Sequence, residues 1–188
     1  MKPGTRALGI AESFQSQTST VCGAVSTTAG DIDGFAFAHC TVGGLDATDT
    51  IADLWQSLDR EDIQYCLISG IAPAWFNILD LHQLSQTLST PVIVLTFESG
   101  DTLVPAIRNA FKSAAAAERI ERYRALPEPT EVPLDQSTVY ARSLDVDSTA
   151  IPAIIRQFTR GGARPEPLRV ARLAARAADK WCRSDRSR

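Results

Sequence analysis

The sequence predicts an α/β fold on a mixed sheet, in which a three-stranded antiparallel meander precedes alternating helices and parallel strands, with further helices at the C-terminus. Three observations support this prediction. The first 42 residues contain three β-rich runs joined by short turns. The hydrophobic period then changes from strand spacing to helix spacing. Two later apolar runs lack alternation, which is typical of strands covered on both faces.

The meander is expected from three runs that alternate in polarity or are continuously β-rich. Its strands are predicted at residues 6–11, 19–27 and 34–42. The turn signal Ala29-Gly30-Asp31 separates the last two of these runs.

The next elements alternate between helix and strand. A helix is predicted from about Asp46 or Thr48 to Leu58, because apolar residues recur there with i, i+3, i+4, i+7 spacing. The two unalternating runs predict strands at 63–69 and 91–97, with a helix over 77–88 between them.

The second half of the chain completes a single domain over residues 1–188. A long Ala-rich helix is predicted over 102–123, followed by a Pro-rich internal linker over 125–133. The remaining predicted elements are a strand at 137–144, helices at 147–159 and 166–182, and a flexible tail at 183–188. The sequence contains no internal repeat.

Composition excludes several classes of protein. No apolar run approaches the roughly 18 residues of a membrane span, and the start MKPGTR does not resemble a signal peptide. We therefore expect a soluble, cytoplasmic protein. The cysteines form no CxxC pair, and Cys22, Cys40 and Cys66 fall inside predicted strands, so we expect free buried thiols rather than disulfides or a thiolate zinc site.

Charge is distributed unevenly along the chain. Residues 1–155 contain 9 Lys or Arg against 19 Asp or Glu, whereas residues 156–188 contain 10 against 3. A basic segment of this kind can follow phosphates, or it can be a solubilising exposed face. Both interpretations stay open from composition alone.

Several segments, taken together and in order, resemble the archaeal endonuclease-V-like family that was catalogued as domain of unknown function ninety-nine and includes proteins called endonuclease dU. They are RALGIAESF, VCGAVSTTAGDIDG, TVGGLDATDTI, LISGIAPAWFNILDL, STPVIVLTFESGD and GGARPEPLRVARLAARA. The resemblance covers almost the whole chain. It implies a ribonuclease-H-like fold, which agrees with the order of the predicted elements.

The resemblance also implies metal-dependent cleavage of DNA near a deaminated base, deoxyuridine in the named activity. Carboxylates at adjacent strand ends would hold Mg²⁺ or Mn²⁺. Three segments depart from the family pattern at these acidic positions. Gly-Ile-Asp-Asp-Gly is replaced by residues 9–13 (GIAES), Val-Asp-Gly by 42–44 (VGG) and Leu-Asp-Gly by 68–70 (ISG), and Trp75 stands where the family has glycine.

The remaining candidates for catalysis are Glu12, Asp46 and Ser69, which we expect to converge with Gly43 at one crevice. Glu12 either ligates a metal, using its extra methylene for reach, or is a solvated charge at a strand end. Asp46 either ligates the metal with it or caps the following helix. Ser69 can form hydrogen bonds or support a water, but it is not a Mg²⁺ ligand equivalent to a carboxylate.

Candidates for substrate binding come from two segments. Phe76 either packs in the core or, with Trp75, forms a wall on which a base could stack, and Asn77 is expected to cap its own helix or contact the substrate. The basic stripe of the last helix contains the phosphate-contacting candidates Arg169, Arg172 and Arg176, with Lys180 beside them.

Two functions remain open from the sequence. The chain is either a metal-dependent nuclease acting on deaminated DNA, with Mg²⁺ or Mn²⁺ as cofactor, or an impaired relative that binds nucleic acid or protein without a cofactor. The missing acids favour weak or absent cleavage, and whether the chain is an enzyme stays undecided at this point. His39 and His82 have no partners at metal-ligand spacing.

Overall fold

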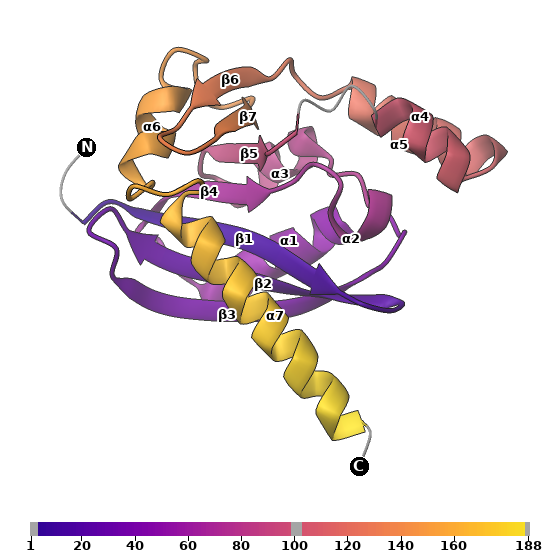
Figure 1. Cartoon of the computed structure of the whole chain (residues 1–188), viewed down its shortest axis with the longest axis horizontal. Helices are drawn as coiled ribbons and strands as arrows, with labels where there is room; N and C mark the ends of the chain where they lie inside the picture. Colours follow the sequence, from indigo (N-terminus) through magenta and orange to yellow (C-terminus); the bar gives the residue numbers. More distant parts are fainter. Residues whose placement is uncertain (1–3, 99–102, 187–188) are drawn as a thin grey trace.

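The computed structural model describes residues 4–98 and 103–186. Its centre is one seven-stranded sheet with the order β3-β2-β1-β4-β5-β7-β6. The strands are β1 (Arg6–Phe14), β2 (Thr18–Thr27), β3 (Ile32–Thr41), β4 (Ile63–Ser69), β5 (Val92–Thr96), β6 (Thr130–Pro133) and β7 (Thr138–Arg142). The predicted mixed sheet is confirmed, because β1, β2 and β3 are antiparallel neighbours and β1, β4 and β5 are parallel neighbours (Figure 1).

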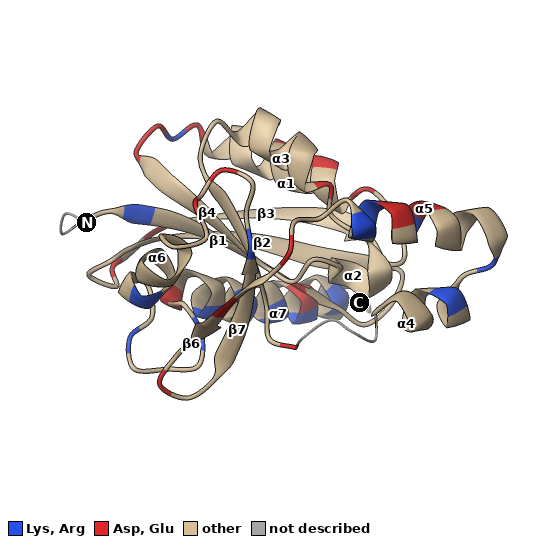
Figure 2. Cartoon of the chain, turned by 90° about the horizontal axis from the view of Figure 1, so that it is seen from above, with Lys and Arg blue, Asp and Glu red and all other residues tan. Residues whose placement is uncertain are grey.

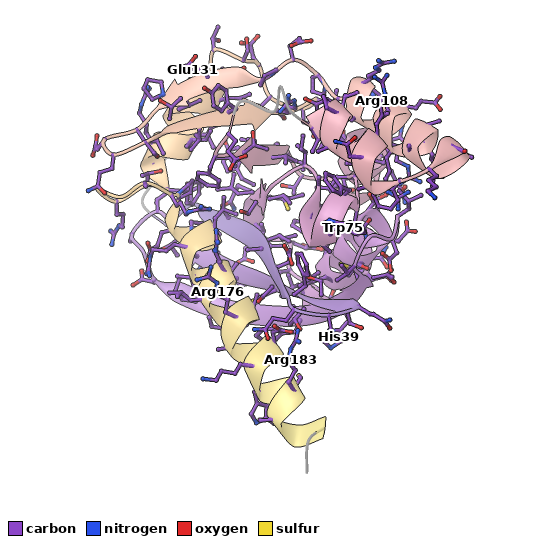
Figure 3. The ribbon with its side chains drawn as sticks, turned by 45° about the vertical axis from the view of Figure 1, so that its right-hand side comes forward. His39, Trp75, Arg108, Glu131, Arg176 and Arg183 are labelled. Atoms are coloured by element: carbon purple, nitrogen blue, oxygen red, sulfur yellow. The ribbon has the colours of Figure 1, made fainter. Side chains whose placement is uncertain are left out.

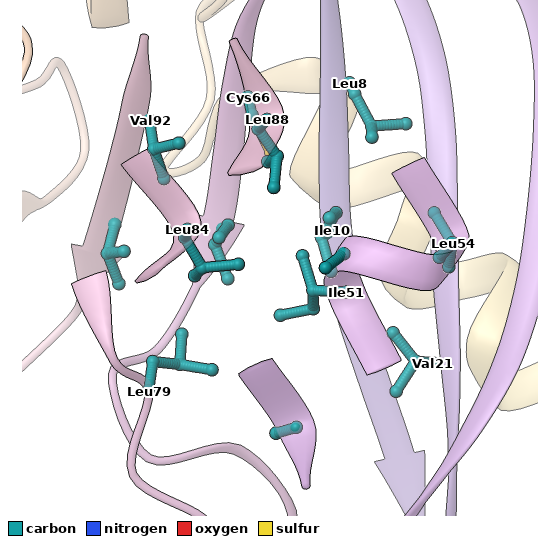
Figure 4. Close-up of a cluster of buried hydrophobic side chains, with 14 of the residues drawn as sticks. Leu8, Ile10, Val21, Ile51, Leu54, Cys66, Leu79, Leu84, Leu88 and Val92 are labelled. Atoms are coloured by element: carbon teal, nitrogen blue, oxygen red, sulfur yellow. The ribbon is translucent and has the colours of Figure 1, made fainter. Parts of the chain in front are cut away.

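Helices cover both faces of this sheet. They are α1 (Ala47–Leu58), α3 (Leu81–Leu88), α4 (Leu103–Ala110), α5 (Ser113–Arg124), α6 (Ile151–Gln157) and α7 (Glu166–Arg186), together with the short segment α2 (Pro73–Phe76). Side chains of α1 and α3 pack against one face of the sheet in a large apolar cluster (Figure 4). Residues of α6 and the start of α7 cover the other face.

Helix α7 crosses β1 and β2 at close range (Figure 1). Gly9 permits this approach, because a Cβ built there would lie 2.2 Å from the carbonyl carbon of Pro167. One turn further on, Ala171 packs against Ala11 and Ala24. Small residues in both layers therefore bring the basic C-terminal helix against the centre of the sheet.

Five predicted segments differ from the observed ones. The helix expected over 77–88 begins at Leu81, where the Asp80 carboxylate accepts a hydrogen bond from the Gln83 N–H. The helix expected over 102–123 is two helices, and its first residue lies outside the described residues. They are separated near Lys112, which is extended, and Ser113, whose φ is 49°.

The helix expected over 147–159 is shorter at both ends, as α6. The segment expected as a linker, 125–133, contains β6 in its second half. This strand pairs with β7 and buries Val132 completely, although two of its four residues are polar and its last residue is proline. Where a flexible tail was expected, α7 continues to Arg186. The last two residues of the expected tail, 187 and 188, lie outside the described residues.

No helix among residues 4–98 and 103–186 is both long enough and apolar enough to cross a membrane.

Candidate functional site

The carboxyl ends of β1 and β4 lie side by side at one edge of the sheet. The register pairs Ile10 with Ile68, so Glu12 lies two residues beyond this pair on β1 and Ser69 one residue beyond it on β4. A small crevice at this edge is lined by both residues, together with Pro73 of α2. Two of the three predicted catalytic residues thus reach the same crevice.

Glu12 and Ser69 nevertheless occupy opposite faces of the sheet. Side chains alternate along a strand, so Glu12 continues the face of Ile10, which packs under α1. Ser69 pairs with Leu95, whose side chain belongs to the cluster on the α6 and α7 face. Ala11 shares that face with Ser69. Glu12 therefore does not replace an acid at position 11.

The carboxylate of Glu12 already has a partner. The Ser19 hydroxyl donates a hydrogen bond of 2.5 Å to its Oε2. The neighbouring Cys40 thiol is buried, and burial together with the negative charges of Asp46 and Glu12 raises its pKa to about 12. Both carboxylates consequently lie near Cys40 on the α1 face.

Asp46 is held by the loop that follows β3. Its carboxylate accepts hydrogen bonds from the Thr41 N–H, at 3.0 Å, and from the Thr41 hydroxyl and the Asn77 amide, both at 2.7 Å. Burial alone would raise the pKa of Asp46, but these hydrogen bonds outweigh it and hold the pKa below its ordinary value. The side chain makes no cap to α1, so the predicted N-cap is wrong. Asp46 ties Thr41 to Asn77 instead.

Asn77 is fully buried and its amide is fully used. Its Oδ1 accepts from the Ala47 N–H at the start of α1, and its Nδ2 donates to the Thr41 carbonyl and to Asp46. The expectation that Asn77 caps its own helix is wrong, because it caps α1 across the fold. Both donor positions on Nδ2 face the protein, which leaves no donor for a base.

The side chains at this edge do not form a divalent metal site. Ala11 and Gly43 supply no donor, and Ser69 supplies a neutral hydroxyl. Asp46 is occupied by three donor groups. Across residues 4–98 and 103–186, no group of three or more His, Cys, Asp or Glu is placed to hold a metal ion. A hard cation such as Mg²⁺ needs several oxygen ligands with fixed charge, so this donor set does not fit it.

The segment α2 is a left-handed turn rather than a helix. Ala74, Trp75 and Phe76 have φ values of 47°, 59° and 61°. Each non-glycine residue in this conformation costs roughly 1–2 kcal/mol. Trp75 stands half-exposed on the outside of the turn, with its ring 5.2 Å from that of Phe111 (Figure 3).

The Trp75 ring lies directly over Gly43. A Cβ at position 43 would meet the Trp75 Cε3 atom at 2.9 Å, and the φ of Gly43 is 71°. An acidic side chain at position 43, as in the family pattern, would compete with the indole for this space. A side chain at position 43 and the indole of Trp75 in its present position would therefore exclude each other.

Arg119 of α5 forms hydrogen bonds to two segments near the indole, the loop after β3 and the turn at residues 73–76. Its guanidinium donates to the Phe76 carbonyl at 3.1 Å, to the Gly44 carbonyl at 3.0 Å and to the Gly43 carbonyl. The cation also lies 3.9 Å from the centre of the Phe111 ring. Burial lowers the pKa of Arg119 from its ordinary value. Backbone carbonyls and a ring face thus replace a carboxylate as its partners.

A separate, open groove of about 500 Å³ extends from the end of β1 along α7. It is lined by residues 12–15 on one side and by Arg172, Arg176 and Lys180 on the other. None of these three cations forms an ion pair with a carboxylate of the described residues. Figure 2 shows that blue, basic positions recur along α7.

Two further arginines lie near this groove without lining it. Arg169, the first member of the predicted stripe, is paired with Glu166 at 2.5 Å and does not line it. Arg164 lies over the Phe97 ring at 3.6 Å, and burial together with the charges of Arg172 and Arg176 lowers its pKa. Positive charge therefore reaches from α7 towards the end of β5.

Sequence reasoning missed Arg119 and Arg164. Nothing in the pattern of the Ala-rich helix distinguishes Arg119 from its neighbour Arg122. Arg164 follows a Gly-Gly pair before a proline, a pattern that indicates a loop and gives no information about contacts.

Comparison with known proteins identifies the chain's relatives. The sequence profile described as Endonuclease dU matches residues 3–179. A UPF0215 protein of Thermococcus kodakarensis is 31% identical over 186 residues, which cover 94% of this chain and 93% of that protein.

Solved structures show the same fold. A protein of unknown function from Archaeoglobus fulgidus superposes with a TM-score of 0.81 at 25% identity, covering 93% of this chain and 98% of that one. Human ENDOV gives 0.63 at 14% identity, with 95% and 86% covered. Ciona intestinalis Endonuclease V, in complex with a 24mer DNA containing an inosine followed by a ribo-adenosine, gives 0.58 at 13%, with 98% and 86% covered.

These likenesses show that the mixed sheet has the ribonuclease-H-like fold of endonuclease V. Because the family profile spans nearly the whole sequence, the chain belongs to the Endonuclease dU family.

Proposed function

We propose that this protein binds nucleic acid across the carboxyl edge of its sheet, with deaminated, deoxyuridine-containing DNA as the substrate class, and that its metal-dependent phosphodiester cleavage is weak or absent. The observation that carries this proposal is the row of cations on α7. Arg172, Arg176 and Lys180 have no carboxylate partner among the described residues, and they line a groove beside the strand ends.

Charge that is left unpaired along a groove favours an anionic ligand. Like charges spaced one turn apart repel one another, and a sugar-phosphate backbone would relieve this repulsion with release of counterions. The DNA bound to the Ciona intestinalis Endonuclease V lends support to this choice of ligand. The endonuclease dU family gives deoxyuridine as the base to test.

Weak or absent cleavage is proposed from the donors at the strand ends. Positions 11 and 69, which share one face, carry alanine and serine, and the carboxylate of Glu12 lies on the other face with Ser19 as its partner. Phosphodiester hydrolysis of this kind needs fixed negative ligands to hold a divalent ion at the scissile phosphate. No step through such an ion follows from the residues present.

Binding is tested by fluorescence anisotropy with labelled oligonucleotides that contain either deoxyuridine or thymidine. The double variant Arg172→Gln and Arg176→Gln should weaken binding to both. It should also reduce the slope of log K against log salt by roughly 0.7–0.9 for each phosphate that the variant no longer neutralises. Arg169→Gln is the matched control, because Arg169 occupies the same helix but pairs with Glu166 outside the groove. An equal decrease of affinity in the control would contradict the groove.

Cleavage is tested on the same oligonucleotides with Mg²⁺ or Mn²⁺. We expect little or no product from the parent protein. Efficient cleavage that Glu12→Gln abolishes would overturn the proposed absence of activity and would assign Glu12 to a metal. An equal affinity for deoxyuridine and thymidine would leave nucleic-acid binding in place and would remove deoxyuridine as the recognised base.

A further inference from the structure

We propose that an unstacked nucleobase of the bound strand stacks on the indole of Trp75. This inference rests on the proposed nucleic-acid binding and names the residue that contacts the base. Trp75 lies at the same carboxyl edge as the groove, since Pro73, two residues earlier, lines the crevice that also contains Glu12. The end of β1 at residue 12 borders both this crevice and the basic groove, so the two adjoin there. Figure 3 labels Trp75 beside α2 and Arg176 on α7.

The backbone conformation that places the Trp75 indole at the surface costs free energy. Three consecutive non-glycine residues adopt left-handed backbone angles in the turn that presents it. Such conformations persist where surrounding contacts over-determine them, and they concentrate at functional sites. A tryptophan serving the core would be buried, yet 48% of the Trp75 surface remains exposed.

Rigid contacts hold the turn from below. The Ala74 carbonyl accepts from the Gly43 N–H at 2.7 Å, and the Pro73 carbonyl accepts from the Asn77 N–H at 3.0 Å. Arg119 fixes the Phe76 carbonyl. Phe111 supports the indole at 5.2 Å and meets Phe76 edge to face. A ring fixed in this way loses little conformational entropy when a ligand stacks on it.

The chemistry of the surroundings favours a nucleobase as the occupant. The exposed indole is a single flat surface, and the groove at the same edge carries cations suited to phosphates. Base stacking on aromatic side chains combined with a positively charged groove is the general mode of single-strand binding. A partner that is apolar throughout would leave the unpaired cations of α7 uncompensated.

The test measures Trp75 directly. The protein contains three tryptophans, so Trp55→Phe and Trp181→Phe leave Trp75 as the only indole. A single-stranded oligonucleotide should quench its fluorescence on binding, whereas an abasic strand of equal length should bind through its phosphates without this quenching.

In the otherwise unchanged chain, Trp75→Ala should weaken binding of the normal strand about tenfold or more, and should leave binding of the abasic strand unaltered. Trp75→Phe should retain most of the affinity, which separates stacking from a folding defect. Trp181→Ala is the control, because Trp181 is 69% exposed on α7 and lies outside the groove residues.

Three outcomes would overturn the inference. If Trp75→Ala binds both strands as the parent does while the groove variant is impaired, stacking fails and the proposed function stands. If the parent binds neither strand, both fail. If light scattering shows a dimer that Trp75→Ala dissociates without oligonucleotide, the ring belongs to a protein interface.

Discussion

At the residue scale, one step along β1 decides which side chains can meet. Residues 11 and 12 are adjacent in sequence, but alternation sends Ala11 under α7 and Glu12 towards α1. A carboxylate at one position therefore does not take over the role of an acid missing from the next. The same reasoning separates Glu12 from Ser69, even though both border one crevice.

Asp46 gives a prediction about pH. We expect Asp46→Asn to lower the free energy of unfolding at pH 7 by about 1–3 kcal/mol, because the carboxylate accepts three donors and is the charged partner in each hydrogen bond. The pKa of Asp46 is lowered in the folded protein from its ordinary 3.8. Its contribution is therefore complete above about pH 4–5 and disappears as pH falls through the lowered pKa.

Urea unfolding at several pH values measures this effect. The difference between parent and Asp46→Asn should shrink as the solution is acidified below about pH 4. Asp53→Asn is a suitable control, because Asp53 is exposed on α1 and has no side-chain hydrogen bond or ion pair among the described residues. A constant difference at all pH values would mean that the carboxylate charge is not the stabilising feature.

Gly43 and Trp75 give a prediction about coupling. Gly43→Asp should destabilise the parent by about 1–3 kcal/mol, since its Cβ would meet the indole at 2.9 Å. In a Trp75→Gly background the same change should cost less by about 0.5 kcal/mol or more, because the ring is gone. Urea unfolding of the four proteins in a double-mutant cycle measures this coupling, and strict additivity would show that the two positions do not compete.

At the element scale, α7 is positioned by the smallest side chain in β1. Gly9 is matched to Pro167 at the start of the helix, and Ala11 to Ala171 one turn later. This packing sets where the cations on the helix flank lie relative to the strand ends. The phosphate-binding candidates of α7 thus depend on glycine and alanine residues that have no polar chemistry.

Gly9→Ala should displace the start of α7. A methyl group would lie 2.2 Å from the Pro167 carbonyl carbon, and relief of this overlap should cost about 1–3 kcal/mol of unfolding free energy. It should also speed tryptic cleavage within α7. Gly34→Ala is the control, because its Cβ would first meet the flexible end of Arg60 at 3.4 Å. If both variants have the stability and cleavage rate of the parent, the close approach does not position the helix.

At the scale of the whole molecule, the sequence predicts the layers better than their connections. Hydrophobic period predicted the meander and α1, and two unalternating apolar runs predicted the parallel pair β4 and β5, which is covered on both faces. These patterns missed β6, whose four residues carry one buried side chain, and the left-handed turn at 73–76, whose shape depends on Arg119 more than forty residues later. Long-range hydrogen bonds of this kind leave no local pattern.

In the candidate site, too, some features could be predicted from the sequence and others could not. That Arg172 and Arg176 lie together on one flank of α7 could be predicted, because the spacing of charges along a helix is visible in the sequence, whereas the pairing of Arg169 with Glu166 was not predicted. Asp46 and Asn77 were placed near the right strand ends, but the capping role predicted for each was wrong. Which donor meets which acceptor depends on loops that the fold closes across thirty residues.

The seating of α7 on β1 has a consequence for biosynthesis. β1 is translated before the other strands of the sheet and lies in the sheet interior, and its α7 face is covered by a helix that is translated after all seven strands. The meander can pair early, but the small apolar residues of β1 and β2 on that face stay uncovered until α7 has been translated, and such surfaces favour misassociation. Premature termination before α7 would therefore release a chain in which the apolar residues of β1 and β2 that α7 covers are exposed. Chaperones and proteases recognise such surfaces.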